Sequence, residues 1–229
     1  MSKKTPSTRE PQYQRSIDLV SQKGPTTFGL MTNQAWQDDP RHVVFTLARY
    51  KFVAKMLSGR SNVLEIGCAD AFGTRLVRQE VQRLTATDFD PVFVEDVLRR
   101  MDDRWKFECR QHDLLAGPFP GSFDAAYALD VIEHINAADE DVFVGNIVKS
   151  LTPEGVLILG SPSLESQAHA SPLSKAGHVN CKTGEGLRAL LERSFHNVFM
   201  FCMNDEVVHT GHHKMAHYVF AIGAGKRST

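Results

Sequence analysis

Short apolar segments alternate with segments of helical periodicity along most of the chain. Between residues 41 and 58, apolar side chains recur at steps of three and four, which predicts an amphipathic helix leading into the first strand. A second helix is expected over 74–81. The apolar segments predict strands, at 63–66, 84–87, 105–109, 122–129, 156–159, 196–203 and 215–222. This alternation is typical of α/β proteins.

The turn after the first predicted strand is the most informative part of the sequence. The strand carries Glu65 and runs directly into a turn of small residues between Gly67 and Gly73. Both glycines tolerate positive φ and have no Cβ, so the backbone can approach a ligand closely, and Ala69 keeps the turn narrow. Because a full G-x-G-x-x-G pattern is missing, the turn alone could serve NAD, a flavin or S-adenosylmethionine.

Acidic residues follow the next two strands. Asp88 ends the second strand, 21 residues beyond Gly67, where an α/β site usually binds the hydroxyls of a ribose. Asp113 follows the third strand, where a carboxylate can accept from an adenine amino group. The structural alternative for Asp88 is a helix N-cap before Pro91, and for the glycines an ordinary turn.

The fourth strand exits through the sequence Asp130-Val131-Ile132-Glu133-His134. Together with the turn and the acids above, this D-V-I-E-H motif resembles the small-molecule branch of the class I S-adenosylmethionine-dependent methyltransferases, over roughly residues 40–223. The resemblance implies a Rossmann-like methyltransferase fold. It has a seven-stranded, mostly parallel sheet with the last strand antiparallel, and the domain is placed at 40–224.

The resemblance also implies the cofactor, S-adenosylmethionine, and its product, S-adenosylhomocysteine. Residues near Gly67 would bind the methionine part, Asp88 the ribose, Phe89 and Asp113 the adenine, and Leu129 would form the wall below the sulfonium. The full set of expected cofactor-binding residues is Glu65, Gly67, Cys68, Ala69, Gly73, Asp88, Phe89, Asp113, Leu114 and Leu129.

Composition agrees with a soluble enzyme. With 229 residues and 42% hydrophobic content, the chain can bury one large core. No apolar run approaches a membrane span and the start has no signal-peptide pattern, so a cytoplasmic location without membrane contact is expected, and a homodimer is left open. The net charge of −1 offers no general attraction to nucleic acid, and the sequence reveals no local basic patch. Four cysteines without C-x-x-C spacing are expected to be reduced thiols.

The first forty residues differ in composition from the rest of the chain. Residues 1–15 are polar, contain two prolines and are expected to be disordered. Residues 16–39 contain apolar side chains together with proline and glycine. The apolar side chains are too few to form a core, but the segment is too apolar to be a disordered tail. This segment is either a helical lid that excludes water during methyl transfer or a static cap on the sheet.

The D-V-I-E-H motif carries the sharpest chemistry on the acceptor side. In a helical turn Asp130, Glu133 and His134 share one face, and with His178 from the next long loop they form a ligand set for Mg²⁺, Mn²⁺ or Zn²⁺. The pattern is similar to the E-x-x-E-H and distant histidine of metal-dependent small-RNA terminal 2′-O-methyltransferases and eukaryotic ubiquinone O-methyltransferases. There the metal lowers the pKa of the methylated hydroxyl. The alternative is a metal-free general base, His134 or His178.

The loop after the sixth strand offers two more catalytic candidates, Asp205 and His209. Its four histidines match no common zinc spacing, so a structural zinc is not expected. An acidic, histidine-rich rim suits a small hydroxylated acceptor, and we expect O-methylation of a sugar or sugar-nucleotide-like hydroxyl, as in methyltransferases of bacterial polysaccharide or natural-product loci. Two alternatives stay open: N-methylation of an amino sugar or other small amine, and a catalytically silent protein that binds S-adenosylmethionine as a scaffold.

Overall fold

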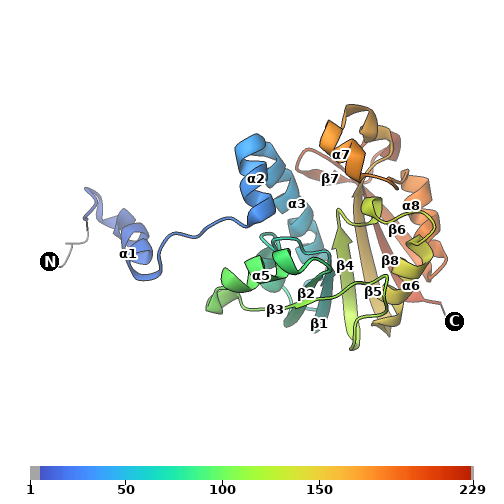
Figure 1. The fold of residues 1–229 in the computed structure, drawn as a ribbon, viewed down its shortest axis with the longest axis horizontal. Helices are drawn as coiled ribbons and strands as arrows, with labels where there is room; N and C mark the ends of the chain where they lie inside the picture. The colour runs from blue at the N-terminus through green and yellow to red at the C-terminus, as the bar shows by residue number, and fades with distance from the viewer. Residues whose placement is uncertain (1–5, 228–229) are drawn as a thin grey trace.

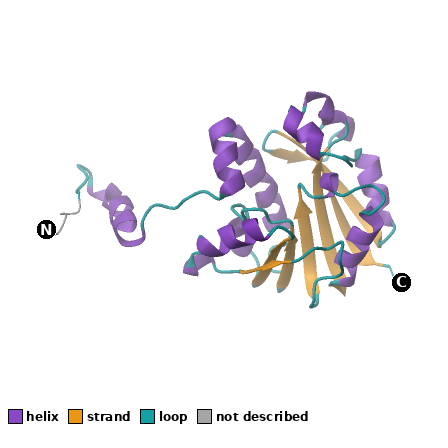
Figure 2. Cartoon of the chain, viewed as in Figure 1, coloured by secondary structure: helices purple, strands orange, loops and turns teal. Residues whose placement is uncertain are grey.

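The computed structural model describes residues 6–227, which form one mixed sheet with helices on both faces (Figures 1 and 2). The sheet has eight strands in the order β3-β2-β1-β4-β5-β8-β6-β7. The strands are β1 (Asn62–Ile66), β2 (Arg83–Asp88), β3 (Glu108–Gln111), β4 (Phe123–Leu129), β5 (Leu151–Pro162), β6 (Phe195–Asn204), β7 (Val207–His209) and β8 (Tyr218–Lys226). Strands β1 to β5 pair in parallel.

The expected sheet architecture is confirmed except for the number of strands. Strand β8, the last along the chain, runs antiparallel to both β5 and β6, as expected. The prediction of seven strands is wrong, because the segment assigned to a loop after β6 contains β7, which pairs antiparallel with the end of β6. A strand of three residues is too short to show a period of two in the sequence.

The helices cover the sheet in two layers (Figure 2). On one face lie α3 (Arg41–Met56), α4 (Thr74–Arg78) and α5 (Pro91–Arg99), and on the other lie α6 (Glu140–Lys149) and α8 (Gly184–Glu192). Consecutive strand residues enter opposite cores: Val63 joins the core under α3 and Leu64 the core under α6. Because both faces are covered, the central strands are apolar at nearly every position rather than alternating.

Two further helices precede α3. Helix α2 (Leu30–Asp38) lies on the turn after β1: the backbone N–H of Thr32 donates to the Asp70 carboxylate at 2.6 Å, and its hydroxyl contacts the same group at 3.2 Å. Helix α1 (Gln14–Lys23) stands away from the rest of the molecule at the end of an extended linker (Figure 1). Residues 16–39 thus include α2, which contacts the turn after β1, and most of α1, which stands apart. Whether the segment is a lid or a cap stays open.

The remaining elements are short. They are α7 (Pro172–Gly177) and the 3₁₀ helices η1 (Pro11–Tyr13), η2 (Asp103–Trp105), η3 (Ile132–His134), η4 (Glu165–His169) and η5 (His213–Met215). The predicted disordered tail, 1–15, overlaps η1 and the start of α1, and its first five residues lie outside the described range. Within residues 6–227, no helix combines the length and the apolar character that crossing a bilayer requires.

Candidate active site

The turn after β1 adopts a conformation that few residues tolerate. Gly67 has φ +68°, and a Cβ there would lie 2.4 Å from Cγ2 of Val131, in the segment after β4. Ala69 and Ala71 also have positive φ, at 44° and 51°. Such strain in non-glycine residues persists only where the surroundings enforce it, and it is concentrated at ligand sites. The turn is therefore a tightly bent backbone cradle at the carboxyl end of β1, where open α/β sheets bind ligands.

Asp88 ties this cradle to β2. One of its carboxylate oxygens accepts from the backbone N–H of Ala69 at 2.9 Å, and the other from the N–H of Asp90 at 3.0 Å. Each oxygen of a carboxylate offers about two lone-pair sites, so both retain capacity for a ligand hydroxyl. Asp90, not Asp88, caps helix α5, because its side chain accepts from the N–H of Val92 at 2.9 Å. The N-cap of α5, which was the structural alternative for Asp88, is thus Asp90.

Glu65 lies beneath the cradle and is 1% exposed. Its carboxylate accepts from the hydroxyl of Tyr50 at 2.8 Å and from that of Thr74 at 2.7 Å, so it links β1 to α3 and α4. Burial raises the pKa of Glu65 to about 7. Gly73 completes this arrangement, since a Cβ there would lie 2.3 Å from the Tyr50 ring.

The other expected cofactor residues surround the same edge of the sheet. Phe89, after β2, is 69% exposed and free to stack on a ligand. Asp113, after β3, accepts from the N–H of Leu115 at 2.8 Å. The remaining expected residues are buried: Cys68, Leu114 and Leu129.

On the acceptor side, Asp130 pairs with an arginine that the sequence analysis did not select. Arg49 of α3 donates through Nη1 to both carboxylate oxygens of Asp130, each at 2.8 Å. Its guanidinium carbon lies 4.0 Å from the centre of the Tyr218 ring, a cation–π contact. Asp130 itself has φ +57°. The ion pair thus fixes a strained residue at the point where β4 ends.

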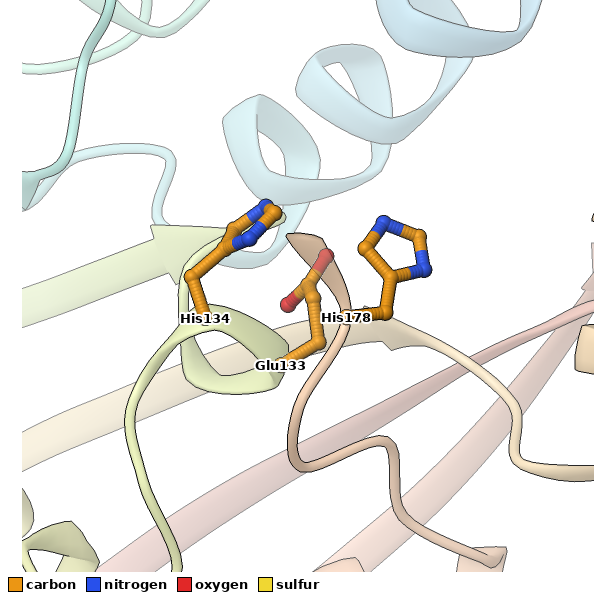
Figure 3. A group of neighbouring side chains, drawn as sticks. All are labelled: Glu133, His134 and His178. Carbon is orange, nitrogen blue, oxygen red and sulfur yellow. The ribbon is translucent and has the colours of Figure 1, made fainter. Parts of the chain in front are cut away.

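Glu133, His134 and His178 converge beside this pair (Figure 3). Their ligand atoms lie within 4.8 Å of one another, and the two imidazole rings are 5.2 Å apart between centres. Glu133 is fully buried, and both carboxylate oxygens lack a hydrogen-bond partner. Burial, reinforced by the charge of Asp130, raises the pKa of Glu133 well above its usual range.

Both imidazoles are oriented by a hydrogen bond at Nδ1. Nδ1 of His134 lies 2.9 Å from the carbonyl oxygen of Gly177, and Nδ1 of His178 lies 2.8 Å from the side-chain oxygen of Gln167. These oxygens only accept, so Nδ1 of each neutral ring carries the hydrogen. Burial and the neighbouring His134 lower the pKa of His178. In its neutral form each ring therefore leaves Nε2 unprotonated, so that it can accept a proton or bind a metal.

The group has the chemistry of a divalent-cation site, with one change from the predicted set. Two imidazole nitrogens and one carboxylate are a ligand set for Zn²⁺ or Mn²⁺, and an orphaned buried carboxylate is the group that a cation would satisfy. Asp130 is not among the converging residues, because its carboxylate is engaged by Arg49. The predicted fourth ligand is therefore replaced by an ion pair.

Asp205 and His209 lie in the β6–β7 hairpin. Nε2 of His209 contacts the side-chain oxygen of Asn204 at 2.9 Å, and Nδ1 accepts from the N–H of Gly211 at 3.0 Å. With both nitrogens bonded, His209 offers no lone pair in this conformation. Asp205, with φ +49°, forms the exposed turn of the hairpin. Neither residue joins the group of Glu133, His134 and His178.

Part of the chain is similar to known proteins. Residues 64–159 match the family described as a methyltransferase domain. A probable S-adenosylmethionine-dependent methyltransferase of Mycolicibacterium smegmatis is 30% identical over 115 residues, which cover 50% of this chain and 42% of that protein. Residues 64–159 therefore carry a methyltransferase domain, within a chain whose fold is that of solved methyltransferases.

Two further relatives align over more of the chain. Nodulation protein S of Rhizobium tropici is 27% identical over 172 residues, which cover 72% of this chain and 70% of that protein. The crystal structure of the N-methyltransferase NodS from Bradyrhizobium japonicum in complex with S-adenosylhomocysteine superposes with a TM-score of 0.59 and 22% identity, covering 82% of this chain and 89% of that one. The structural likeness supports the fold, and the chain spans under half of the length of the mycobacterial relative.

The matched family and the S-adenosylhomocysteine bound in the NodS crystal structure agree with the expected cofactor. The residue that the sequence analysis missed is Arg49. It lies four residues after Phe45 and three before Phe52, within a helical stripe that is otherwise apolar. A charged residue within an apolar stripe is the signal by which the sequence could have revealed Arg49. The sequence gives no such signal for its partner, which lies 81 residues away along the chain.

Proposed function

We propose that the methyltransferase transfers the methyl group of S-adenosylmethionine to a hydroxyl of a small polar acceptor, such as a sugar. The observation that carries the proposal is the pair of imidazoles, His134 and His178, which are oriented by hydrogen bonds at Nδ1 and converge with the orphaned carboxyl of Glu133. A hydroxyl must lose its proton as it attacks the sulfonium methyl, and a positioned imidazole accepts such a proton. The turn after β1, Asp88 and Phe89 would position the cofactor.

The charge of this wall favours an uncharged acceptor over a cation. Arg49 neutralises Asp130, and the raised pKa of Glu133 favours its protonated, uncharged form. His178 is kept neutral by its lowered pKa. An ammonium ion entering this site would meet no free carboxylate to replace its hydration, and that loss is costly.

A divalent cation is part of the proposal as an alternative means of activation. Glu133, His134 and His178 would bind it, and it would supply Lewis-acid polarisation that lowers the pKa of the acceptor hydroxyl. Gly177 and Gln167 accept hydrogen bonds from Nδ1 of the two imidazoles. Histidine ligands of metals usually make such a hydrogen bond through the ring nitrogen that does not bind the metal. In either mode, Arg49 and Asp130 keep the β4 exit in place beside these ligands.

The second candidate is methylation of a small amine. It is favoured by the similarity to Nodulation protein S and to a solved structure described as an N-methyltransferase. In that case the acceptor would bind as the free amine, and His134 or His178 would take its proton before the attack. The third possibility, a silent scaffold, requires cofactor binding without turnover.

A methyl-release screen separates these candidates. Calorimetry with S-adenosylmethionine and S-adenosylhomocysteine comes first, to establish cofactor binding. The screen then compares sugars, nucleotide sugars, catechols and amines, with the His134→Ala/His178→Ala double variant as control. Turnover of a hydroxyl substrate that the control loses supports the proposal. Turnover of amines alone supports the second candidate, and cofactor binding with no turnover across the panel supports the scaffold.

A further inference from the structure

A hollow of about 700 Å³ lies at the opposite edge of the sheet from the candidate active site. It is formed where β2 and β3 begin and is walled by the loop at residues 119–123, before β4. The cofactor cradle lies at the carboxyl ends of the strands, so the two sites are separated by the length of the sheet. We call it the basic hollow, after its charged side chains, which are Arg78, Arg83, Lys106, Arg110 and Glu108.

The register of β2 and β3 explains why these side chains meet. Thr85 pairs with Glu108 and Thr87 with Arg110, and alternate residues of a strand share one face. Leu84 and Cys109 point into the core under α4 and α5, so Thr85 and Glu108 point to the other face. On that other face, the helices pack against β5, β6 and β8. The start of β2 and β3 is thus left open to solvent there.

The basic hollow carries an excess of positive charge. It has four basic side chains and one carboxylate, a formal charge of +3 in a chain of net charge −1. The carboxylate of Glu108 is already paired with Arg110. The Arg78 guanidinium is held in place by the carbonyl oxygens of Lys106, at 2.9 Å, and Val81, at 3.0 Å. Like charges gathered at one concavity repel one another, and an anion would relieve that repulsion.

We propose that the basic hollow binds a phosphorylated small molecule of nucleotide size through its phosphate oxygens. Its volume falls within the range of roughly 300–1,000 Å³ of small-ligand sites. Guanidinium groups recognise phosphate through paired hydrogen bonds, and an ammonium adds a point charge. The charges are confined to one walled concavity instead of following an extended stripe, which favours a small anion over a nucleic-acid chain.

A purely structural role makes a different prediction. Strand β3 forms an edge of the sheet, and charged side chains on edge strands prevent pairing with other chains. In that case the charges would need no ligand. A direct binding measurement therefore separates the two roles.

The test uses the full chain saturated with S-adenosylhomocysteine, so that a nucleotide probe cannot enter the cofactor site. Calorimetric titrations with inorganic pyrophosphate and with ADP should show saturable binding that weakens as NaCl is added. The double variant Arg83→Glu/Lys106→Glu should weaken both at least tenfold. The matched control is Lys149→Glu, an exposed lysine at the end of α6 and outside the hollow, which should bind as the wild type does.

Affinity for S-adenosylhomocysteine should be equal in all three proteins, which reports that each is folded. If the double variant fails this check, the single change Lys106→Met is used, with a loss of at least threefold expected. Pyrophosphate binding equal to that of ADP assigns recognition to phosphate alone, and tighter ADP binding assigns a nucleotide. No saturable binding, or binding unchanged in the folded variants, overturns the proposal in favour of edge protection. Tighter binding of a single-stranded oligonucleotide than of ADP overturns it in favour of nucleic acid.

Discussion

Arg49 and Asp130, 81 residues apart in sequence, form a two-oxygen ion pair that joins the first long helix to the exit of the central strand. The Asp130 side chain is about one-third exposed, while Arg49 lies over Tyr218. The pair restrains Asp130 in the left-handed backbone conformation, which residues other than glycine seldom adopt. It also keeps the carboxylate from acting as a metal ligand. The geometry of the acceptor wall therefore depends on a helix that contributes no proton acceptor.

Replacing Arg49 by Met should reduce the free energy of unfolding by about 2 kcal/mol, on the scale of hydrogen bonds to charged groups. In an Asp130→Asn background the same change should cost much less, because the charge that Arg49 compensates is already gone. Urea denaturation of the four proteins measures this coupling. Arg41→Met, on the same helix and exposed, is the control and should unfold as the wild type does. Equal costs in both backgrounds would contradict the role of the pair.

Asp88→Ala should weaken S-adenosylmethionine binding by about 2–3 kcal/mol, because two hydrogen bonds to a charged group are lost. Calorimetry measures the affinity. The matched control is Asp90→Ala, which removes the cap of α5 and should cost about 1 kcal/mol of stability with little change in cofactor affinity. Unchanged affinity in Asp88→Ala would mean that the ribose is bound by other residues.

Glu65 should make stability fall as the pH rises. The folded protein retains a proton up to a pKa of about 7, whereas the unfolded chain releases it near 4.5. The contribution is therefore complete below pH 4.5 and is lost between pH 4.5 and 7, by on the order of 1 kcal/mol for each pH unit. Thermal unfolding from pH 5 to 8 should show a shallower decline in Glu65→Gln than in wild type. Glu95→Gln, an exposed change, should leave the slope unaltered.

The fold follows from local signals, and so does much of the candidate site. The turn from Gly67 to Gly73 and the acids after β2 and β3 are recognisable because each follows an apolar strand, and parallel strands bring their carboxyl ends to one edge. The same rule brings His134, after β4, near His178, after β5. Local errors arise where the signal is weak. Strand β3 begins at Glu108, three residues later than predicted from its aromatic side chains.

The features that the sequence did not reveal depend on contacts between distant segments. Arg49 finds Asp130 only once α3 packs on the sheet. The basic hollow depends on the register of β2 with β3, which joins residues spread between 78 and 110. These positive charges form no run along the chain. Pairing register is a tertiary property, and one-dimensional charge counts do not contain it.

Helix α1 should respond to the cofactor more than α2 does. Helix α2 is already anchored to Asp70 through Thr32, whereas Leu19 and Val20 of α1 are about half exposed. Amide hydrogen exchange should therefore slow in Gln14–Lys23 on addition of S-adenosylhomocysteine, with α2 protected in both states. Helix α6, on the opposite face, is the internal control. Equal exchange in α1 with and without the cofactor product would contradict a moving lid.

The last prediction separates metal-assisted from metal-free activation, in the assay that the acceptor screen provides. If a cation bound by Glu133, His134 and His178 lowers the pKa of the acceptor hydroxyl, EDTA should abolish turnover and Zn²⁺, Mn²⁺ or Mg²⁺ should restore it. Glu133→Gln should then raise the metal concentration needed. Cofactor affinity should stay the same, because none of the three residues contributes to the turn after β1.

If an imidazole acts alone, EDTA should have no effect, and His134→Ala or His178→Ala should lower the rate about 10²–10⁴-fold. The rate should rise with pH through the pKa of the proton acceptor. Burial and the neighbouring ring lower the pKa of His178. If His178 is the base, the rate should therefore increase at a pH below the ordinary imidazole pKa of 6.5. Loss of the rise in His178→Ala, with cofactor binding intact, would identify that residue. A rate insensitive to EDTA and to both substitutions would contradict both modes and leave proximity to the sulfonium methyl as the main source of catalysis.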